Sequence, residues 1–497
     1  MGGRQEVSRA DRPANKVAAG SQYELRKGFS FRTAWSLAFA DVSPIVALYA
    51  IFALALLSAG PAFWWGFPIV LAGQLLVACV FAELASRWPY EGSVYQWARH
   101  VHSTAWGWFA AWAYMWGLTI ALSALSYAAA GFLGEAVGLS NLGRWTVTAI
   151  ALGVVAFGSL ANIIGRTILK VFVVASLTCE VLASVGLGTV LLLFYRENSL
   201  DVLLSGFGAQ AGGSWLGGPF LVAVAFIGWS FLGFESAGSI AEEVTEPERN
   251  VPKALVLSLL AVGLIVMYAG LAIILAIPNL DAVLSGKVLD PVSGTLEAHF
   301  GTGIGRYLLI LFVIGFTASF LAVQAAVSRA IWANARDGGL PGSSFLGKLA
   351  GPERLPVNSI LLTTAGATVF VLLAGSEFYA VLVNFTTIGF YVAFGFPVVG
   401  AALARLRGEW RPGPFNFGRF SGAITYTAAA WIIFETINVV WPRDTPAPWY
   451  VDWSMTLTLA VVTCIGLVVF SLWKDRILEA WGERILRHDE RAPGTTP

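Results

Sequence analysis

The hydrophobic pattern of the chain consists of long apolar runs separated by short polar segments. A helix needs about 20 apolar residues to cross roughly 30 Å of hydrocarbon, and twelve runs reach that length. They lie near residues 33–58, 65–85, 105–134, 143–163, 168–195, 215–241, 254–277, 304–334, 356–374, 377–404, 421–441 and 450–473. The pattern therefore predicts an all-α integral membrane protein with 12 transmembrane helices.

The polar segments predict the domain organisation and the orientation. We expect an N-terminal tail at 1–30, a transmembrane domain at 31–473 and a C-terminal tail at 474–497. The tail before the first span has no apolar core of a signal peptide, so we expect this span to be retained. Of the 31 Lys and Arg residues, 26 fall on the side of the N-terminus and five on the other. This asymmetry predicts cytoplasmic termini in a multi-pass protein of the plasma (inner) membrane.

Composition and charge narrow the function. Only 12% of the residues are charged and 57% are hydrophobic, whereas a soluble domain carries about 25% charged residues. The lipid bilayer is therefore the expected surroundings of most of the surface. A net charge of +1 without a basic cluster excludes nucleic acid as a partner. The few histidines and cysteines do not group at membrane depth, so we expect no metal site, no cofactor and no enzyme.

Two of the predicted spans contain residues that interrupt helices. In the first span Pro44 follows Ser43, and proline has no N–H for the helical ladder. The sixth span carries Gly228, Gly233 and Gly238, and each glycine costs a helix about 1 kcal/mol relative to alanine. Breaks that lie five spans apart are typical of two inverted repeats whose broken helices meet at mid-membrane. We therefore expect the first and sixth helices to be broken around a shared cavity.

Three acidic residues lie at membrane depth: Asp41, Glu180 and Glu235. An ionisable group in this position costs at least about 2.5 kcal/mol on insertion scales, and it commonly marks a functional site. A structural alternative remains for each, because hydroxyl or amide groups can hold a carboxylate that only fixes helix packing. Asp41 lies close enough to the first break to act as a helix cap.

Three motifs resemble the amino acid-polyamine-organocation transporter superfamily, and most closely its amino acid/choline transporter branch. The first is Trp229–Ala237, continued by Ala241-Glu242-Glu243 and Arg249–Ala254. The other two lie on the same side of the membrane, in the segments Pro89–Tyr95 and Ala335–Pro341. The likeness covers about residues 29–473.

The resemblance implies a LeuT-like fold, with ten helices in a 5+5 inverted repeat plus two more, and alternating access around a central site. It implies that Trp229 stacks over the substrate and gates it, and that Glu235 couples this gate to the helix bundle. Glu180 occupies a place comparable to the ion-coupling position of the fifth helix. A carboxylate there would carry a proton or coordinate sodium.

One departure from the family pattern concerns the first break. Relatives that bind an α-carboxylate offer bare amides from a Gly-x-Gly segment, whereas this chain has Ser43-Pro44-Ile45-Val46. Screened amides favour a substrate that is recognised by its ammonium group, for which aromatic side chains supply cation–π contacts. The expected substrate-binding residues are Ser43, Pro44, Ile45, Val46, Tyr49, Trp112, Trp229, Ser230, Phe231 and Asn384.

The sequence thus predicts a secondary active transporter that imports a small amino acid or related amine by alternating access. A proton is the expected coupling ion and sodium is the alternative. Other hypotheses are a carrier of organic cations or polyamines (choline, ethanolamine, putrescine), an uncoupled exchanger, or a transport-like sensor. The sequence leaves the oligomeric state open.

Overall fold

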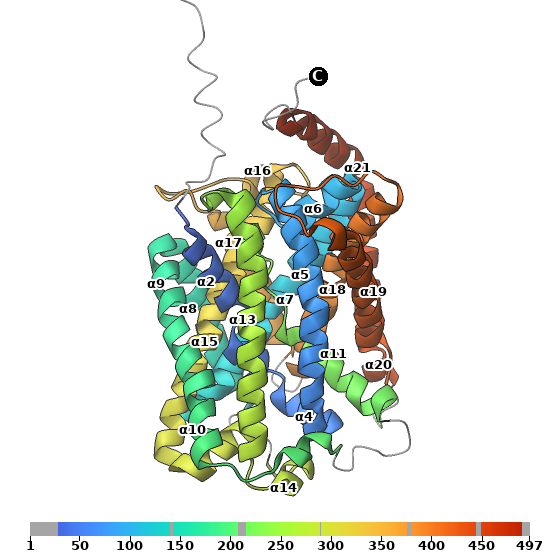
Figure 1. The fold of residues 1–497 in the computed structure, drawn as a ribbon. Helices are drawn as coiled ribbons and strands as arrows, with labels where there is room; N and C mark the ends of the chain where they lie inside the picture. Colours follow the sequence, from blue (N-terminus) through green and yellow to red (C-terminus); the bar gives the residue numbers. More distant parts are fainter. Residues whose placement is uncertain are drawn as a thin grey trace, which may run out of the picture.

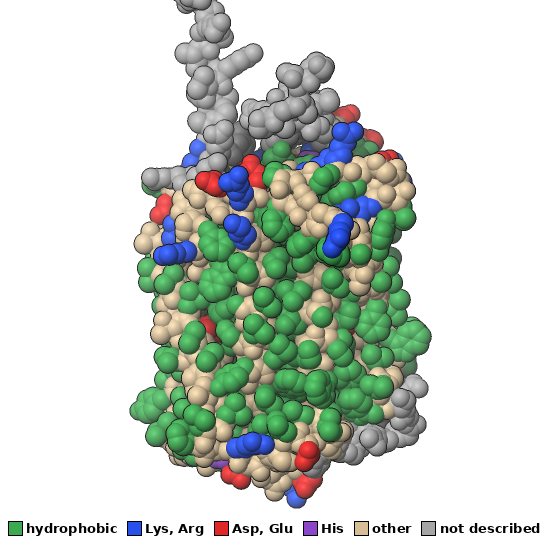
Figure 2. Space-filling view, in the orientation of Figure 1, with side chains coloured by type: hydrophobic (Ala, Val, Ile, Leu, Met, Phe, Trp, Pro, Cys, Tyr) green, Lys and Arg blue, Asp and Glu red, His purple; other side chains and the backbone are tan. Residues whose placement is uncertain are grey.

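A computed structural model describes residues 28–139, 143–206, 215–288, 290–374, 379–443 and 449–489. In this part of the chain, long helices run side by side as a bundle (Figure 1). Hydrophobic side chains cover the middle of the bundle, and Lys and Arg gather at one end of it (Figure 2). That end carries the start of α2 together with α6 and α16, and we call it the N-terminal face; α14 lies on the opposite face.

The first group of helices extends to residue 204. It comprises α2 (Phe31–Val42), α3 (Pro44–Tyr49), α4 (Phe52–Ala59), η1 (Pro61–Trp65), α5 (Gly66–Arg87), α6 (Val94–Val101), α7 (Thr104–Ala136), α8 (Arg144–Ile164), α9 (Arg166–Glu180), the π-helical η2 (Val181–Gly186), α10 (Leu187–Phe194) and η3 (Leu200–Leu204).

The second group begins with the π-helical η4 at residue 216. It comprises η4 (Leu216–Phe220), α11 (Leu221–Ser230), α12 (Ser236–Ser239), η5 (Ala241–Glu243), α13 (Pro247–Ala276), α14 (Leu280–Leu284), α15 (Pro291–Arg336), α16 (Ser343–Leu346), α17 (Val357–Ala374), α18 (Tyr379–Leu406), η7 (Gly418–Phe420), α19 (Ser421–Val440), α20 (Trp449–Asp452) and α21 (Ser454–Asp489).

The described helices match the predicted apolar runs. Nine of them are long and apolar enough to cross a membrane, and the pair Phe31–Tyr49 and Phe52–Ala59, bent by 44°, coincides with the first predicted span. The shorter apolar helices Leu216–Ser230 and Val357–Leu373 fall within the sixth and ninth. The expectation of a helical, multi-pass membrane protein is confirmed. The count of twelve spans and the LeuT-like repeat stay predictions.

Two helices extend further than the hydropathy indicates. Helix α21 continues to Asp489, well past the predicted span end at residue 473. Helix α15 begins at Pro291, where the Asp290 carboxylate accepts a hydrogen bond from Val292 N at 2.9 Å, and it kinks at Gly301. Hydropathy detects only the apolar part of a helix, so it did not indicate the polar turns at the start of α15 and at the end of α21.

Helices α7 and α18 approach closely enough for their backbones to touch. A Cβ atom on Gly389 would lie only 2.8 Å from the Cα atom of Gly117. Small residues permit such contacts between membrane helices. The contact brings polar and apolar side chains of both helices to the space beside the two helix breaks.

Candidate functional site

The first helix break lies at Ser43, between α2 and α3. This residue adopts φ 50° and ψ 116°, and Pro44 opens α3 at its first position. Proline suits this place because the first N–H groups of a helix have no intrahelical acceptor. The break predicted from Pro44 is therefore present, and Ser43 is the one non-helical residue between α2 and α3.

The second break separates α11 from α12, and it touches the first. Gly233 adopts φ 99°, and a Cβ atom on it would lie 2.8 Å from Asp41 Oδ1. Only glycine fits this combination of conformation and close approach. The Ser230 hydroxyl donates a hydrogen bond of 2.5 Å to Ala47 O. The two breaks that the sequence predicts thus meet in space.

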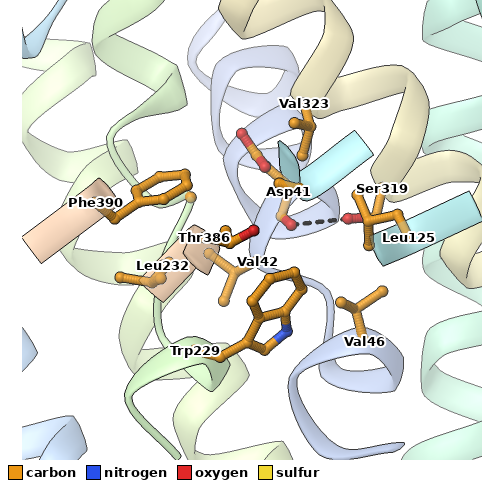
Figure 3. A pocket seen from close by; sticks show the side chains of 12 residues that line it. Asp41, Val42, Val46, Leu125, Trp229, Leu232, Ser319, Val323, Thr386 and Phe390 are labelled. Atoms are coloured by element: carbon orange, nitrogen blue, oxygen red, sulfur yellow. Dashed lines mark hydrogen bonds between the residues drawn. The ribbon is translucent and has the colours of Figure 1, made fainter. Parts of the chain in front are cut away.

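A small cavity lies at this meeting point (Figure 3). Helices α2, α3, α7, α11, α15 and α18 contribute to its wall, together with the segment that follows α11. The lining residues are Asp41, Val42, Val46, Ala121, Leu125, Trp229, Leu232, Gly233, Ser319, Val323, Thr386 and Phe390.

Asp41 is the only acidic residue among those that line the cavity. Its side chain is 5% exposed, and its Oδ2 atom has no hydrogen-bond partner. The Asp41 main-chain carbonyl accepts a hydrogen bond of 2.9 Å from the Ser319 hydroxyl (Figure 3). A buried carboxylate is costly unless a cation or a donor pairs with it. This oxygen therefore offers a place for a positively charged group.

A second buried carboxylate, that of Glu235, lies across Gly233 from Asp41. It accepts hydrogen bonds from the Tyr114 hydroxyl at 2.8 Å and from Gly233 N at 3.2 Å. No ion pair of the described residues includes either acid. The two acids together favour a cation in this part of the site.

Glu180 binds the first helix break directly. Its carboxylate accepts hydrogen bonds from the Ser43 hydroxyl at 2.5 Å and from Ile45 N at 2.9 Å. The Ser43 hydroxyl oxygen in turn accepts from Val46 N at 3.2 Å. Since Pro44 has no N–H, the protein itself satisfies every amide at the start of α3. The sequence predicted that the side chains of the break itself screen these amides, whereas here the Glu180 carboxylate from α9 and the Ser43 hydroxyl accept from them.

Of the ten predicted substrate-binding residues, Val46 and Trp229 line the cavity. Four others surround the breaks without lining it: Ser43, Pro44, Ile45 and Ser230.

The remaining four predicted residues do not line the cavity. The Tyr49 hydroxyl donates to Ala183 O at 3.0 Å. Trp112 Nε1 donates to Val462 O on α21 at 2.9 Å. Phe231 is buried and packs edge-on against Phe67. Asn384 is half-buried and is not among the lining residues, whereas Thr386, two positions later, lines the cavity.

The three motif segments meet in a network of charged residues at the N-terminal face. Arg329 pairs with Glu243 at 3.0 Å, and both side chains are at most 2% exposed. Arg99 pairs with Asp337 at 3.1 Å, and the Tyr95 hydroxyl donates to the same carboxylate. Helix α6, the η5 turn after α12 and the end of α15 are thereby held together at this face.

Arg336, Glu242 and Glu91 belong to the same network. Arg336 pairs with Glu242 at 3.1 Å. Burial and the nearby carboxylates of Glu243 and Glu242 raise the pKa of Glu91 well above its usual range. The face therefore concentrates charge that is paired inside the protein.

The segment before α2 is tied to the same network by main-chain hydrogen bonds. Gly28 N and Phe29 N both donate to Glu243 O at 3.0 Å. Thr245 N donates in return to Phe29 O at 3.0 Å. The residue that pairs with Arg329 thus also holds the start of the described chain.

Comparison with known proteins adds the family. The family model described as amino acid permease matches residues 29–470. An amino-acid permease of Schizosaccharomyces pombe, named as uncharacterized, is 25% identical over 90% of this chain and 84% of its own. The choline transporter of Saccharomyces cerevisiae is 25% identical over 92% and 83%. The amino-acid permease BAT1 of Arabidopsis thaliana is 21% identical over 91% and 92%.

The family match covers most of the chain, and both broken helices and the charged network lie inside it. The relatives are named as permeases or as a transporter, which confirms the resemblance read from the motifs. The chain therefore belongs to the amino acid permease family of the amino acid-polyamine-organocation superfamily.

Proposed function

We propose that this permease is a secondary active transporter that imports a small organic amine by alternating access. We further propose that it lies in the plasma membrane with its N-terminal face toward the cytoplasm. The family supports transport of an amino acid or amine. The gathering of Lys and Arg at the N-terminal face supports the orientation (Figure 2).

The carboxylate of Asp41 is the observation that supports an amine as the substrate. Its Oδ2 atom is buried and unpartnered at the cavity, so an ammonium group placed there gains a charge-assisted contact. Trp229 lines the same cavity and offers an aromatic face, the best partner for cation–π contact. Both features select for positive charge.

The start of α3 argues against a carboxylate on the substrate. Glu180 and Ser43 already occupy the amides of Ile45 and Val46, and a substrate carboxylate would meet the negative charge of Asp41. We therefore favour amines without an α-carboxylate over zwitterionic amino acids. The amino acid stays the second candidate, because two of the three relatives above are named as amino-acid permeases.

For the coupling ion we propose a proton that binds Glu180. This carboxylate contacts the break itself through Ser43 and Ile45. Protonation weakens both hydrogen bonds, because a neutral acid is a poorer acceptor than a carboxylate. The charge state of Glu180 is therefore linked to how firmly α3 is held against α9.

A ligand screen tests the substrate class. The purified protein is heated with choline, ethanolamine, putrescine, γ-aminobutyrate and a set of zwitterionic amino acids, with sodium chloride as the ionic-strength control. A ligand at 100 times its dissociation constant adds about 2.7 kcal/mol of stability. We expect carboxylate-free amines to raise the melting temperature and zwitterions to leave it unchanged.

The other outcomes of this screen are equally informative. Stabilisation by zwitterions alone would replace the amine with an amino acid as the substrate. Binding of an amine that proteoliposomes then fail to accumulate or exchange would favour the transport-like sensor. Stabilisation by none of these compounds would contradict both substrate classes.

The variant Trp229→Ala is expected to weaken amine affinity by up to about 30-fold, since a desolvated cation–π contact is worth about 2 kcal/mol. Insertion into the membrane should be normal, because the ring faces a cavity. Titration of the melting temperature with the best amine measures the affinity. Trp229→Phe keeps an aromatic face and should lose less. An unchanged affinity in the alanine variant would remove Trp229 from the binding site.

A further inference from the structure

A second group of polar side chains lies buried between α5, α18 and α19, outside the cavity. Its members are Gln74, Tyr391, Trp431 and Glu435. Five of their atoms are buried without a hydrogen-bond partner: Gln74 Nε2, Gln74 Oε1, Tyr391 Oη, Trp431 Nε1 and Glu435 Oε1. Buried polar atoms in proteins are almost always paired, so such a concentration points to a ligand.

The packing places this group directly beside α11, the helix that carries Trp229. The Tyr391 ring covers Gly228 of α11, where a Cβ atom would lie 3.2 Å from the Tyr391 hydroxyl oxygen. The Trp431 ring covers Gly73 in the same way, next to Gln74. Tyr391 lies beside Gln74 and within electrostatic range of Glu435. Gly228 precedes Trp229, so the buried group is one residue away from the cavity wall.

A chain of hydrogen bonds connects Glu435 with the end of α19 that lies toward the opposite face. Asn438 Nδ2 donates to Glu435 Oε2 at 3.2 Å and to Leu221 O at 3.0 Å. Arg443, which follows α19, donates to Asn438 Oδ1 at 2.7 Å. Arg443 is half-buried, whereas Glu435 is fully buried. Two polar side chains, Asn438 and Arg443, thus link the carboxylate to that end of α19.

We propose that Glu435 is a proton-binding site, filled from the face opposite the N-terminal face. A proton from water at that face binds Glu435 Oε1, and the carboxylate becomes a neutral acid beside Gln74 and Tyr391. The reverse step returns the proton to water. The charged and titratable groups beside it are Arg443, which binds Asn438 in place of the carboxylate, and the Tyr391 hydroxyl.

The donor set favours a proton over a metal cation. Gln74 Nε2 and Trp431 Nε1 carry hydrogens that repel a cation, whereas oxygen ligands alone suit hard metal ions. Glu435 Oε1 can take a proton, and Gln74 Oε1 and Tyr391 Oη can accept hydrogen bonds from a neutral acid or from water. Proton binding here does not depend on the substrate.

Infrared difference spectroscopy across a pH titration tests the site without any substrate. We expect the purified protein to show C=O absorption of buried carboxylic acids, and Glu435→Gln to lose one component of it while the component of Glu180 remains. Tyr391→Phe keeps the acid and should shift its band, because a polar hydroxyl within electrostatic range of the acid is removed. Glu297→Gln is the matched control at an exposed glutamate. In this control variant the infrared difference should appear at the frequency at which solvated carboxyl groups absorb.

The results separate this site from the proposed function. A spectrum of Glu435→Gln identical to that of the parent, with the variant eluting as a single folded species, would overturn the proton site. If the glutamine variant fails to fold, an unshifted band in Tyr391→Phe overturns it instead. If the parent protein binds none of the tested substrates, only the transport proposal is contradicted, because the infrared band needs no ligand.

Discussion

Asparagine at position 41 is expected to weaken amine binding by at least about 30-fold, because a buried charge that loses its partner costs about 2 to 5 kcal/mol. Asp41→Asn keeps the shape of the side chain and removes only its charge. The Oδ2 atom of Asp41 has no partner inside the protein, so the loss should appear in substrate binding more than in folding. Isothermal titration with the best amine measures it.

Two comparisons make this test specific to the carboxylate. Ser319→Ala removes the hydroxyl that binds the Asp41 carbonyl at 2.9 Å, and its effect should be much smaller because the carboxylate remains. The melting temperature of the ligand-free Asp41→Asn protein should equal or exceed that of the parent, since an unpaired buried charge is gone. Parent-like affinity in Asp41→Asn would place the ammonium group elsewhere.

Glutamine at position 180 is expected to abolish gradient-driven accumulation while exchange of substrate continues. Glu180→Gln retains an oxygen that accepts from Ser43 or Ile45, the two donors seen in the structure. It cannot take up or release a proton between pH 4 and 9. Proteoliposomes with an imposed pH gradient measure accumulation, and counterflow with equal substrate and pH on both sides measures exchange.

The coupling ion follows from the same assay. Replacing sodium by potassium on both sides should leave accumulation by the parent unchanged, while collapse of the pH gradient should stop it. Accumulation by Glu180→Gln at the parent level would remove Glu180 from coupling. Loss of exchange as well as accumulation would assign Glu180 a structural role in holding α3.

Local sequence signals predicted the helix breaks well. Pro44 and Gly233 stand at the two breaks, because a missing N–H and a positive φ are properties of single residues. Trp229 was predicted at the cavity from the motif around it, and it lines the cavity. Asp41 was recognised as an acid at membrane depth, although its place in the cavity wall was not predicted.

The side chains that face the cavity were harder to predict. Trp112 and Tyr49 lie on helices that are apolar on all sides, so periodicity does not reveal which side faces the centre. Asn384 was chosen for its polarity, yet Thr386 lines the cavity, because residues two apart point to different sides of a helix.

Partners far apart in sequence were beyond prediction. Glu180 and Ser43 are separated by 137 positions, and Gln74 and Glu435 lie on helices from opposite ends of the chain. Their proximity arises from tertiary packing, which no local pattern records. An alignment in which these positions covary would have supplied the missing signal.

The attachment of the segment before α2 has a mechanical consequence. Glu243 holds Arg329 through its side chain and receives Gly28 and Phe29 through its carbonyl. Moving α12 away from α15 while α2 stays in place would therefore strip these main-chain bonds together with the ion pair. Residues Gly28 and Phe29 therefore add to the work required to separate α12 from α15 at the N-terminal face.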